Sequence, residues 1–149
     1  MEEGININLL ASIRDKFELG EQDLRTYSPL VLAYVGDAIY EIVIRTILVS
    51  EANEAVEKLH KKATKLVKAA AQKDMILAVY DELTEDEMYV YKRARNSKQH
   101  TTPKNADIGD YHKATGFEAV MGYLYLKNDI DRMLELIKKG VDVVRNDDK

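Results

Sequence analysis

The stretch from Ser28 to Arg45 constrains the fold more than any other part of the chain. Ser28 can accept a hydrogen bond from a free backbone N–H of a first helical turn, and Pro29 suits the first helical position. The residues that follow are apolar on nearly every side, which predicts a helix from Pro29 to about Val49 that is buried on several faces. Asp37 lies in the middle of this helix, where a buried carboxylate is costly unless something compensates it.

A second largely apolar helix is expected from Tyr111 to about Leu126, capped by Asp110, and it carries Glu118 near its centre. A buried carboxylate must be protonated, paired with a cation or bound to a metal.

One interpretation of these acids is structural: Glu41 pairs with Arg45, and Asp37 pairs with a lysine. The other is that Asp37 and Glu118 meet across the two helices and hold a hard cation. Two carboxylates, with water and substrate phosphate at the remaining positions, suit magnesium. Spacing alone leaves both interpretations open.

The remainder of the chain predicts further helices and no convincing strand. Helical patterns cover residues 4–17 and 54–73, the latter capped by Asn53 and either continuing or restarting after Asp74. Thr84 begins a capping box for a helix that ends near Asn96. A final amphipathic helix, capped by Asn128 or Asp129, runs through residue 144. We therefore expect one all-α domain of six or seven helices over residues 1–149.

Composition excludes several classes of function. The chain has no cysteine, and its three histidines have no close partner, which argues against thiol chemistry and a zinc site. No apolar run is long enough to span a membrane, and the acidic N-terminus lacks a signal pattern, so we expect a cytoplasmic protein. Since the net charge is −4, any basic surface must be local.

Two local basic surfaces stand out. One side of the predicted 54–73 helix carries five lysines, a pattern that favours a solvated face over a phosphate-binding one: Lys58, Lys61, Lys62, Lys65 and Lys68. The segment from residue 92 to residue 113 carries six basic and two acidic residues, a local charge of +4. Its polar part, residues 97–109, is either a solvated linker or a functional loop. Magnesium carboxylates beside an arginine-rich loop are typical of a nuclease.

Two motifs resemble the signatures of the ribonuclease III family. Leu32-Ala33-Tyr34-Val35-Gly36-Asp37-Ala38 is similar to the family's Leu-Glu-Phe-Leu-Gly-Asp-Ala/Ser. The stretch from Thr115 to Leu126, Thr-Gly-Phe-Glu-Ala-Val-Met-Gly-Tyr-Leu-Tyr-Leu, is similar to Asp-x-Phe-Glu-Ala-x-x-Gly-Ala-x-Tyr-Leu. The two motifs occur in the family's order, and the resemblance covers about residues 26–138.

The chain ends soon after the second motif, so we expect no appended double-stranded-RNA-binding domain. This feature, with Ala-Arg-Asn-Ser-Lys at 94–98 and Thr-Thr-Pro-Lys-Asn at 101–105, resembles the Mini-ribonuclease III subgroup. The resemblance implies a homodimeric ribonuclease III-like endonuclease fold and no membrane. It also implies Mg²⁺-dependent cleavage of double-stranded RNA, with Mn²⁺ as a substitute, in the maturation of the 23S ribosomal RNA precursor.

The resemblance assigns catalytic and metal-binding roles to Asp37 and Glu118. The family's other two acids are replaced by Ala33 and Thr115, and Glu41 and Thr115 are auxiliary candidates. The expected RNA contacts come from the basic segment: Arg93, Arg95, Asn96, Lys98, Thr101, Thr102 and Lys104. Because two acids are missing, a catalytically degenerate helical protein that binds double-stranded RNA stays open as an alternative.

Overall fold

The computed structural model describes residues 8–97 and 107–147. Over these residues the chain forms seven α-helices, two short 3-10 helices and no strand, which confirms the all-α prediction. The α-helices are α1 (Leu9–Lys16), α2 (Pro29–Glu51), α3 (Val56–Val67), α4 (Ala69–Val79), α5 (Glu85–Arg95), α6 (Ile108–Leu126) and α7 (Ile130–Asp147), and the 3-10 helices are η1 (Leu24–Thr26) and η2 (Tyr80–Glu82).

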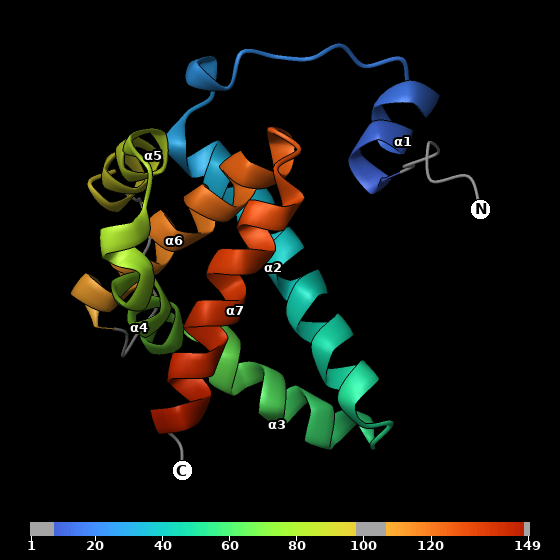
Figure 1. Cartoon of the computed structure of the whole chain (residues 1–149), viewed down its shortest axis with the longest axis vertical. Coiled ribbons are helices and arrows are strands. Elements are labelled where there is room, and N and C mark those ends of the chain that lie inside the picture. Colours follow the sequence, from blue (N-terminus) through green and yellow to red (C-terminus); the bar gives the residue numbers. More distant parts are fainter. Residues whose placement is uncertain (1–7, 98–106, 148–149) are drawn as a thin grey trace.

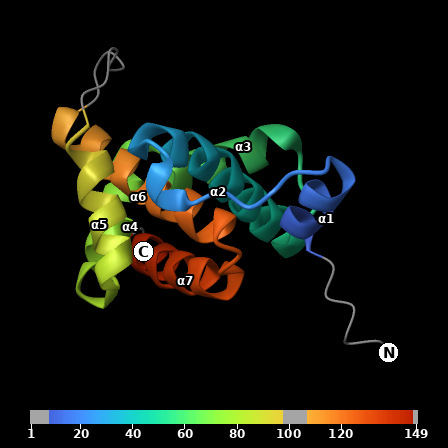
Figure 2. The ribbon, with the colours of Figure 1, turned by 90° about the horizontal axis from the view of Figure 1, so that it is seen from above.

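Helix α6 is the centre of the fold. It packs against α2, α4, α5 and α7, and α4 also packs against α7. Figures 1 and 2 show α6 between α2 and α5, with α7 covering another of its sides. Phe117, Val120 and Met121 of α6 are fully buried. This surrounded position explains why α6 is apolar over most of its surface.

Helix α2 begins as predicted, but its burial differs from the prediction. The Ser28 hydroxyl accepts a hydrogen bond from the backbone N–H of Val31 at 3.2 Å, and Pro29 is the first helical residue. Five of the six buried residues form a stripe at four-residue spacing, namely Leu32, Gly36, Tyr40, Ile44 and Leu48, and the sixth is Ala33.

The expectation that α2 is buried on several sides, with Asp37 inside, is therefore wrong for the single chain. Asp37 is exposed, and Tyr34 keeps 81% of its surface accessible. Helices α3, α5 and α6 pack against α2, yet Val31, Tyr34 and Ile42 stay exposed, so part of the α2 surface is left uncovered.

The predicted helix over residues 54–73 is divided in two. Helix α3 ends at Val67, Lys68 adopts an extended conformation with ψ of 156°, and α4 begins at Ala69. The break leaves carbonyl groups at the end of α3 without helical partners. One of them, Leu66, accepts a hydrogen bond of 2.6 Å from the buried Tyr40 hydroxyl. A tertiary contact with α2 thus supports the break, which periodicity alone did not reveal.

Two other predicted helix starts differ from the structure: α1 begins at Leu9 after the Asn8 cap, and α3 begins after Ala55, which makes no side-chain cap hydrogen bond, instead of after the predicted Asn53 cap. The remaining boundaries agree with the sequence to within a few residues. The capping box at Thr84 is confirmed, since Thr84 and Glu87 exchange hydrogen bonds between side chain and backbone. Helix α6 begins three residues earlier than predicted because Asp107, not Asp110, is its cap. Asn128, with φ of 65°, ends α6 in the left-handed conformation typical of helix C-termini.

Helix α1 lies apart from the other helices and joins them through an extended segment (Figure 1). Its contact with the body includes the buried side chain of Leu10 and a hydrogen bond from Arg14 to the Leu126 carbonyl at 3.0 Å. Across the described part of the chain, no helix combines the length and apolar character needed to cross a membrane.

Candidate active site

The candidate site depends on an unusually close crossing of α2 and α6. A Cβ atom placed on Gly36 would lie 1.7 Å from the backbone carbonyl oxygen of Glu118. A Cβ atom on Gly122 would lie 2.0 Å from the carbonyl oxygen of Leu32. Both distances are far below van der Waals contact, so only glycine allows the two backbones to meet here. The glycines of the two motifs therefore allow the two helix backbones to come into contact at one point.

This crossing brings Asp37 and Glu118 together. Asp37 directly follows Gly36, and its carboxyl group is a hydrogen-bonding neighbour of the Glu118 carboxyl group. Burial, the negative charge of Asp37 and the hydrogen bond between the two groups raise the pKa of Glu118 to about 8. The charge of Glu41 acts in the same direction. A cluster of acids with such a raised pKa attracts either a proton or a cation.

Gln72 of α4 is a site residue that the sequence analysis missed. Its side chain is only 2% exposed, and its amide hydrogen bond to Glu118 lowers the pKa of that carboxyl group, opposing the effect of burial. A buried amide next to a carboxylate fixes the direction in which the carboxylate points. The available signal was a polar residue at position 72, directly after Ala71 and three residues before Met75, two positions that are buried in the core.

The two auxiliary candidates already have partners. Glu41 accepts a hydrogen bond of 2.8 Å from Arg45, so the ion pair expected from their spacing is present. The Thr115 hydroxyl donates to the Tyr111 carbonyl of its own helix at 3.0 Å, and Thr115 is buried. Their roles at the site stay predictions.

A hollow in the surface of α2 lies beside Asp37, one member of the acidic pair. It has a volume of about 330 Å³ and is lined by Asp37, Ala38, Glu41, Ile42 and Arg45. The hollow is open to solvent and contains two acids and one guanidinium group. The Asp37 side chain is thus accessible to solvent from this side in the single chain.

The donor set fits a hard divalent cation that keeps most of its water. Within residues 8–97 and 107–147, no three acidic, histidine or cysteine side chains gather closely enough to form a metal cage. Asp37 and Glu118 supply two carboxylates, which matches the way Mg²⁺ is held by one or two carboxylates together with water and phosphate oxygens. The repulsion that raises the pKa of Glu118 is what a bound cation would relieve.

The described RNA-contact candidates lie at the end of α5. The Arg93 guanidinium lies over the Tyr89 ring at 5.3 Å, and that of Arg95 lies over Tyr91 at 5.5 Å. Arg95 also donates to Asn96 at 3.2 Å. Four further candidates fall outside the described residues: Lys98, Thr101, Thr102 and Lys104.

Comparisons with known proteins agree with this geometry. Residues 30–129 match the Ribonuclease III domain family. The chain is 52% identical over 133 residues to a Mini-ribonuclease 3 of Clostridium tetani, covering 86% of this chain and 88% of the relative. It is 43% identical over 126 residues to a Mini-ribonuclease 3 of Thermoanaerobacter, covering 85% and 89%.

A crystal structure of a Fusobacterium nucleatum protein superimposes with a TM-score of 0.74 at 30% sequence identity, covering 82% of this chain and 98% of that one. The fold, the two glycine-containing motifs and the sequence matches thus agree. The chain belongs to the ribonuclease III domain family, whose members are endoribonucleases that act on double-stranded RNA.

Proposed function

We propose that this protein is a Mg²⁺-dependent endoribonuclease in which Asp37 and Glu118 form the catalytic and metal-binding centre of one domain spanning residues 1–149. The observation that carries the proposal is the pairing of the two carboxyl groups across the Gly36–Gly122 crossing, where burial and the charge of Asp37 together raise the pKa of Glu118 to about 8. A structural protein gains nothing from two carboxyl groups in contact, because one of them must then hold a proton at neutral pH or be neutralised by a cation.

The chemistry is hydrolysis of a phosphodiester bond: water attacks phosphorus, the bond to one ester oxygen breaks, and that oxygen takes a proton. Mg²⁺, with Mn²⁺ as a substitute, would neutralise phosphate charge and lower the pKa of the attacking water. Asp37, which is exposed, orients that water by accepting a hydrogen bond from it. Glu118 would hold the metal ion from the buried side of the site. The hydrogen bond from Gln72 keeps the Glu118 carboxylate in place.

The proposed substrate is double-stranded RNA, with the precursor of 23S ribosomal RNA as the physiological target. The support is the similarity to Mini-ribonuclease 3 proteins over more than four fifths of the chain. A-form RNA is read by its shape and backbone. Arg93 and Arg95, with Asn96, are the proposed phosphate and sugar contacts, together with Lys98, Thr101, Thr102 and Lys104.

The proposed assembly is a homodimer formed through the uncovered face of α2. This face carries exposed apolar side chains at helical spacing: Val31, Tyr34, Ile42 and Val49, which are 47%, 81%, 58% and 53% exposed. Exposed apolar side chains at helical spacing on one helix are typical of a protein interface. Because the face adjoins Asp37, two-fold pairing would place two sites near one another, one for each strand of a duplex.

Glu41 and Thr115 are the proposed auxiliary residues of the site. Glu41 is close enough to Glu118 to affect its pKa, and Thr115 lies on the same helix as Glu118. Glu41 acts on Glu118 electrostatically while it is paired with Arg45. Thr115 occupies the position one turn before Glu118 on α6. We expect both to influence rate and metal affinity without being essential.

The competing candidate is a protein that binds double-stranded RNA without cutting it, and it is favoured by the small number of acids: Ala33 and Thr115 stand where the family has two more. The test is incubation of the purified protein with an end-labelled RNA duplex in Mg²⁺, in Mn²⁺ and in EDTA. Cleavage in either metal that EDTA abolishes supports the nuclease. Binding without cleavage in both metals supports the competing candidate.

A further inference from the structure

One side of α3 carries a row of unpaired cations. Lys58, Lys61 and Lys65 are exposed, and their spacing of three and four residues places them on the same side of α3. Lys68, the residue that follows the helix, is also exposed. We call these four residues the α3 lysine row. The ten-residue interval from Lys58 to Lys68 corresponds to a length of about 15 Å.

The row differs from the other lysines of the helix and from those of α7. Lys62, also on α3, is paired with Glu54, while Lys138 and Lys139 are paired with Asp142 and Glu82. In the part of the chain that the structure describes, no acidic side chain pairs with any member of the row. Adjacent like charges on a helix repel one another, so the row favours an anionic partner from outside the chain.

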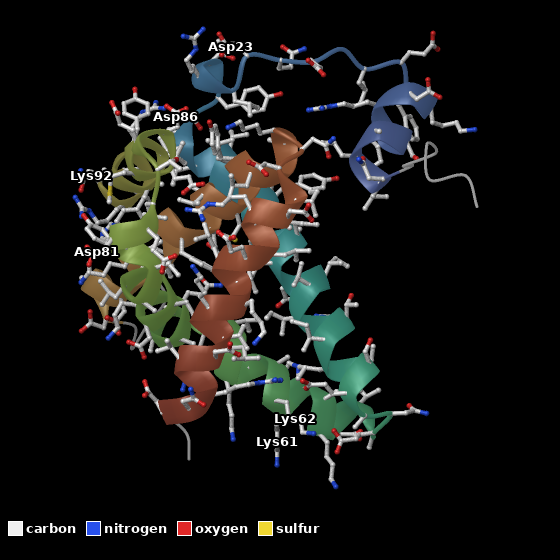
Figure 3. The ribbon with its side chains drawn as sticks, viewed as in Figure 1. Asp23, Lys61, Lys62, Asp81, Asp86 and Lys92 are labelled. Atoms are coloured by element: carbon white, nitrogen blue, oxygen red, sulfur yellow. The ribbon has the colours of Figure 1, made fainter. Side chains whose placement is uncertain are left out.

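The row begins beside the acidic pair. Tyr40, one turn after Asp37, donates its hydroxyl hydrogen bond to Leu66, two residues before Lys68. Gln72, one turn after Lys68, contacts Glu118. Lys68 therefore lies in the chain between Leu66, which contacts α2 near Asp37, and Gln72, which contacts Glu118. From there the row leads away along α3, where Lys61 points outward from the body of the molecule (Figure 3).

We propose that the α3 lysine row binds the phosphate backbone of the RNA duplex next to the candidate cleavage site and extends the RNA-binding surface by about 15 Å. The inference rests on the proposed function. Lysine ammonium groups are point charges that contact phosphates without reading sequence, which suits a duplex recognised by shape. Because the chain as a whole carries a charge of −4, a duplex is attracted only where basic residues gather. A duplex bound at the site would therefore extend along the α3 lysine row.

The test compares two triple variants that remove the same charge. The row variant is Lys58→Gln, Lys61→Gln and Lys65→Gln, which keeps helix propensity because Gln and Lys are similar helix formers. Lys68 stays unchanged because it sits at the junction of α3 and α4. Binding of a fluorescent RNA duplex is measured by anisotropy in EDTA from 50 to 300 mM KCl, with circular dichroism to confirm helicity.

The matched control is Lys62→Gln, Lys138→Gln and Lys139→Gln. The row variant should bind about tenfold to a hundredfold more weakly at 100 mM KCl, and the slope of log affinity against log salt should become shallower by roughly two to three. The control should keep both values near those of the wild type. Equal effects of the two variants, or no effect of either, would overturn the inference.

Further outcomes of these experiments separate this inference from the proposed function and from binding to a membrane. If the wild type binds the duplex through the row but does not cleave it in Mg²⁺ or Mn²⁺, the nuclease proposal fails and the row stands. If the wild type cleaves the duplex and the row variant binds it unchanged, the row alone fails. A row variant that loses binding to phosphatidylserine vesicles but not to RNA overturns the row as an RNA surface.

Discussion

Gly36 and Glu118 touch through their backbones: a Cβ atom on Gly36 would lie 1.7 Å from the Glu118 carbonyl oxygen. Because Asp37 is the next residue after Gly36, this contact determines how close the two carboxyl groups can be. The packing of α2 on α6 and the chemistry of the site therefore depend on the same glycine.

Gly36→Ala should damage both stability and activity. The added methyl group cannot fit between the helices without moving them, so we expect the free energy of unfolding to fall by more than about 3 kcal/mol. A displacement of the acids by about 1 Å should lower the cleavage rate by roughly a hundredfold in whatever protein remains folded.

Gly20→Ala is the matched control, since nothing lies within 4 Å of a Cβ atom there. It should change the free energy of unfolding, measured by urea denaturation, by less than about 0.5 kcal/mol. If the two alanine variants were equally stable, the close crossing of α2 and α6 would not be needed for the fold.

The stability of the metal-free protein should fall as the pH rises toward 8. The folded state keeps a proton on Glu118 up to a pKa of about 8, whereas the unfolded state releases it near the ordinary value of 4.5. The folded state thus binds more protons between these values, and stability falls as the pH rises through that window. Glu118→Gln removes this dependence.

The measurement is urea denaturation of wild type and Glu118→Gln at several pH values from 5 to 8.5 in EDTA. The wild type should lose roughly 4 kcal/mol relative to the variant across this range, since stability falls by about 1.4 kcal/mol for each pH unit between the two pKa values. Saturating Mg²⁺ should reduce the loss, because a cation that binds only the folded state stabilises it. Parallel curves in EDTA would contradict the raised pKa.

Gln72→Leu should weaken metal binding more than it weakens the fold. Leucine nearly preserves the volume of the buried side chain but cannot donate a hydrogen bond to Glu118, so the carboxylate loses its orientation. We expect Mn²⁺ affinity, measured by calorimetry without RNA, to fall about tenfold to a hundredfold, as for other residues that orient metal ligands. Gln22→Leu, on the exposed segment before η1, is the control and should bind Mn²⁺ like the wild type. Unchanged affinity in Gln72→Leu would remove Gln72 from the site.

Tyr34→Glu combined with Ile42→Glu should produce a monomer. Both side chains lie on the uncovered face of α2, so two acids there would oppose pairing with a second copy. Light scattering after gel filtration should show a dimer for the wild type and a monomer for the variant. Tyr89→Glu with Leu77→Glu, two exposed apolar residues on α5 and α4, is the control and should stay dimeric. A wild type that is monomeric at micromolar concentration would refute the proposed assembly.

The sequence predicted the elements whose signals are local. The Ser28–Pro29 start of α2 and the capping box at Thr84 involve residues within one turn of each other, and both are present. The proximity of Asp37 and Glu118 was one of two interpretations that the spacing left open, and in the structure the two carboxyl groups are neighbours. The two helix starts could be predicted because they depend only on residues that are close in the sequence.

The features that the sequence did not reveal depend on contacts between distant residues. The break at Lys68 is supported by Tyr40, which is 26 residues away from its partner Leu66. Gln72 gained its role only when α4 was placed against Glu118. The exposure of Asp37 was missed because the apolar face of α2 predicted burial, and periodicity does not distinguish burial inside a chain from burial against a second copy.

The central claim is tested most directly by Asp37→Asn. The substitution keeps the size of the side chain and removes one of the two charges at the site, so the free energy of unfolding should be unchanged or higher. The rate of Mg²⁺-dependent cleavage of an RNA duplex, measured in single-turnover conditions, should fall at least about a thousandfold. Asp81→Asn, an exposed acid on η2, should cleave like the wild type. Cleavage by Asp37→Asn at a rate near that of the wild type would contradict the account.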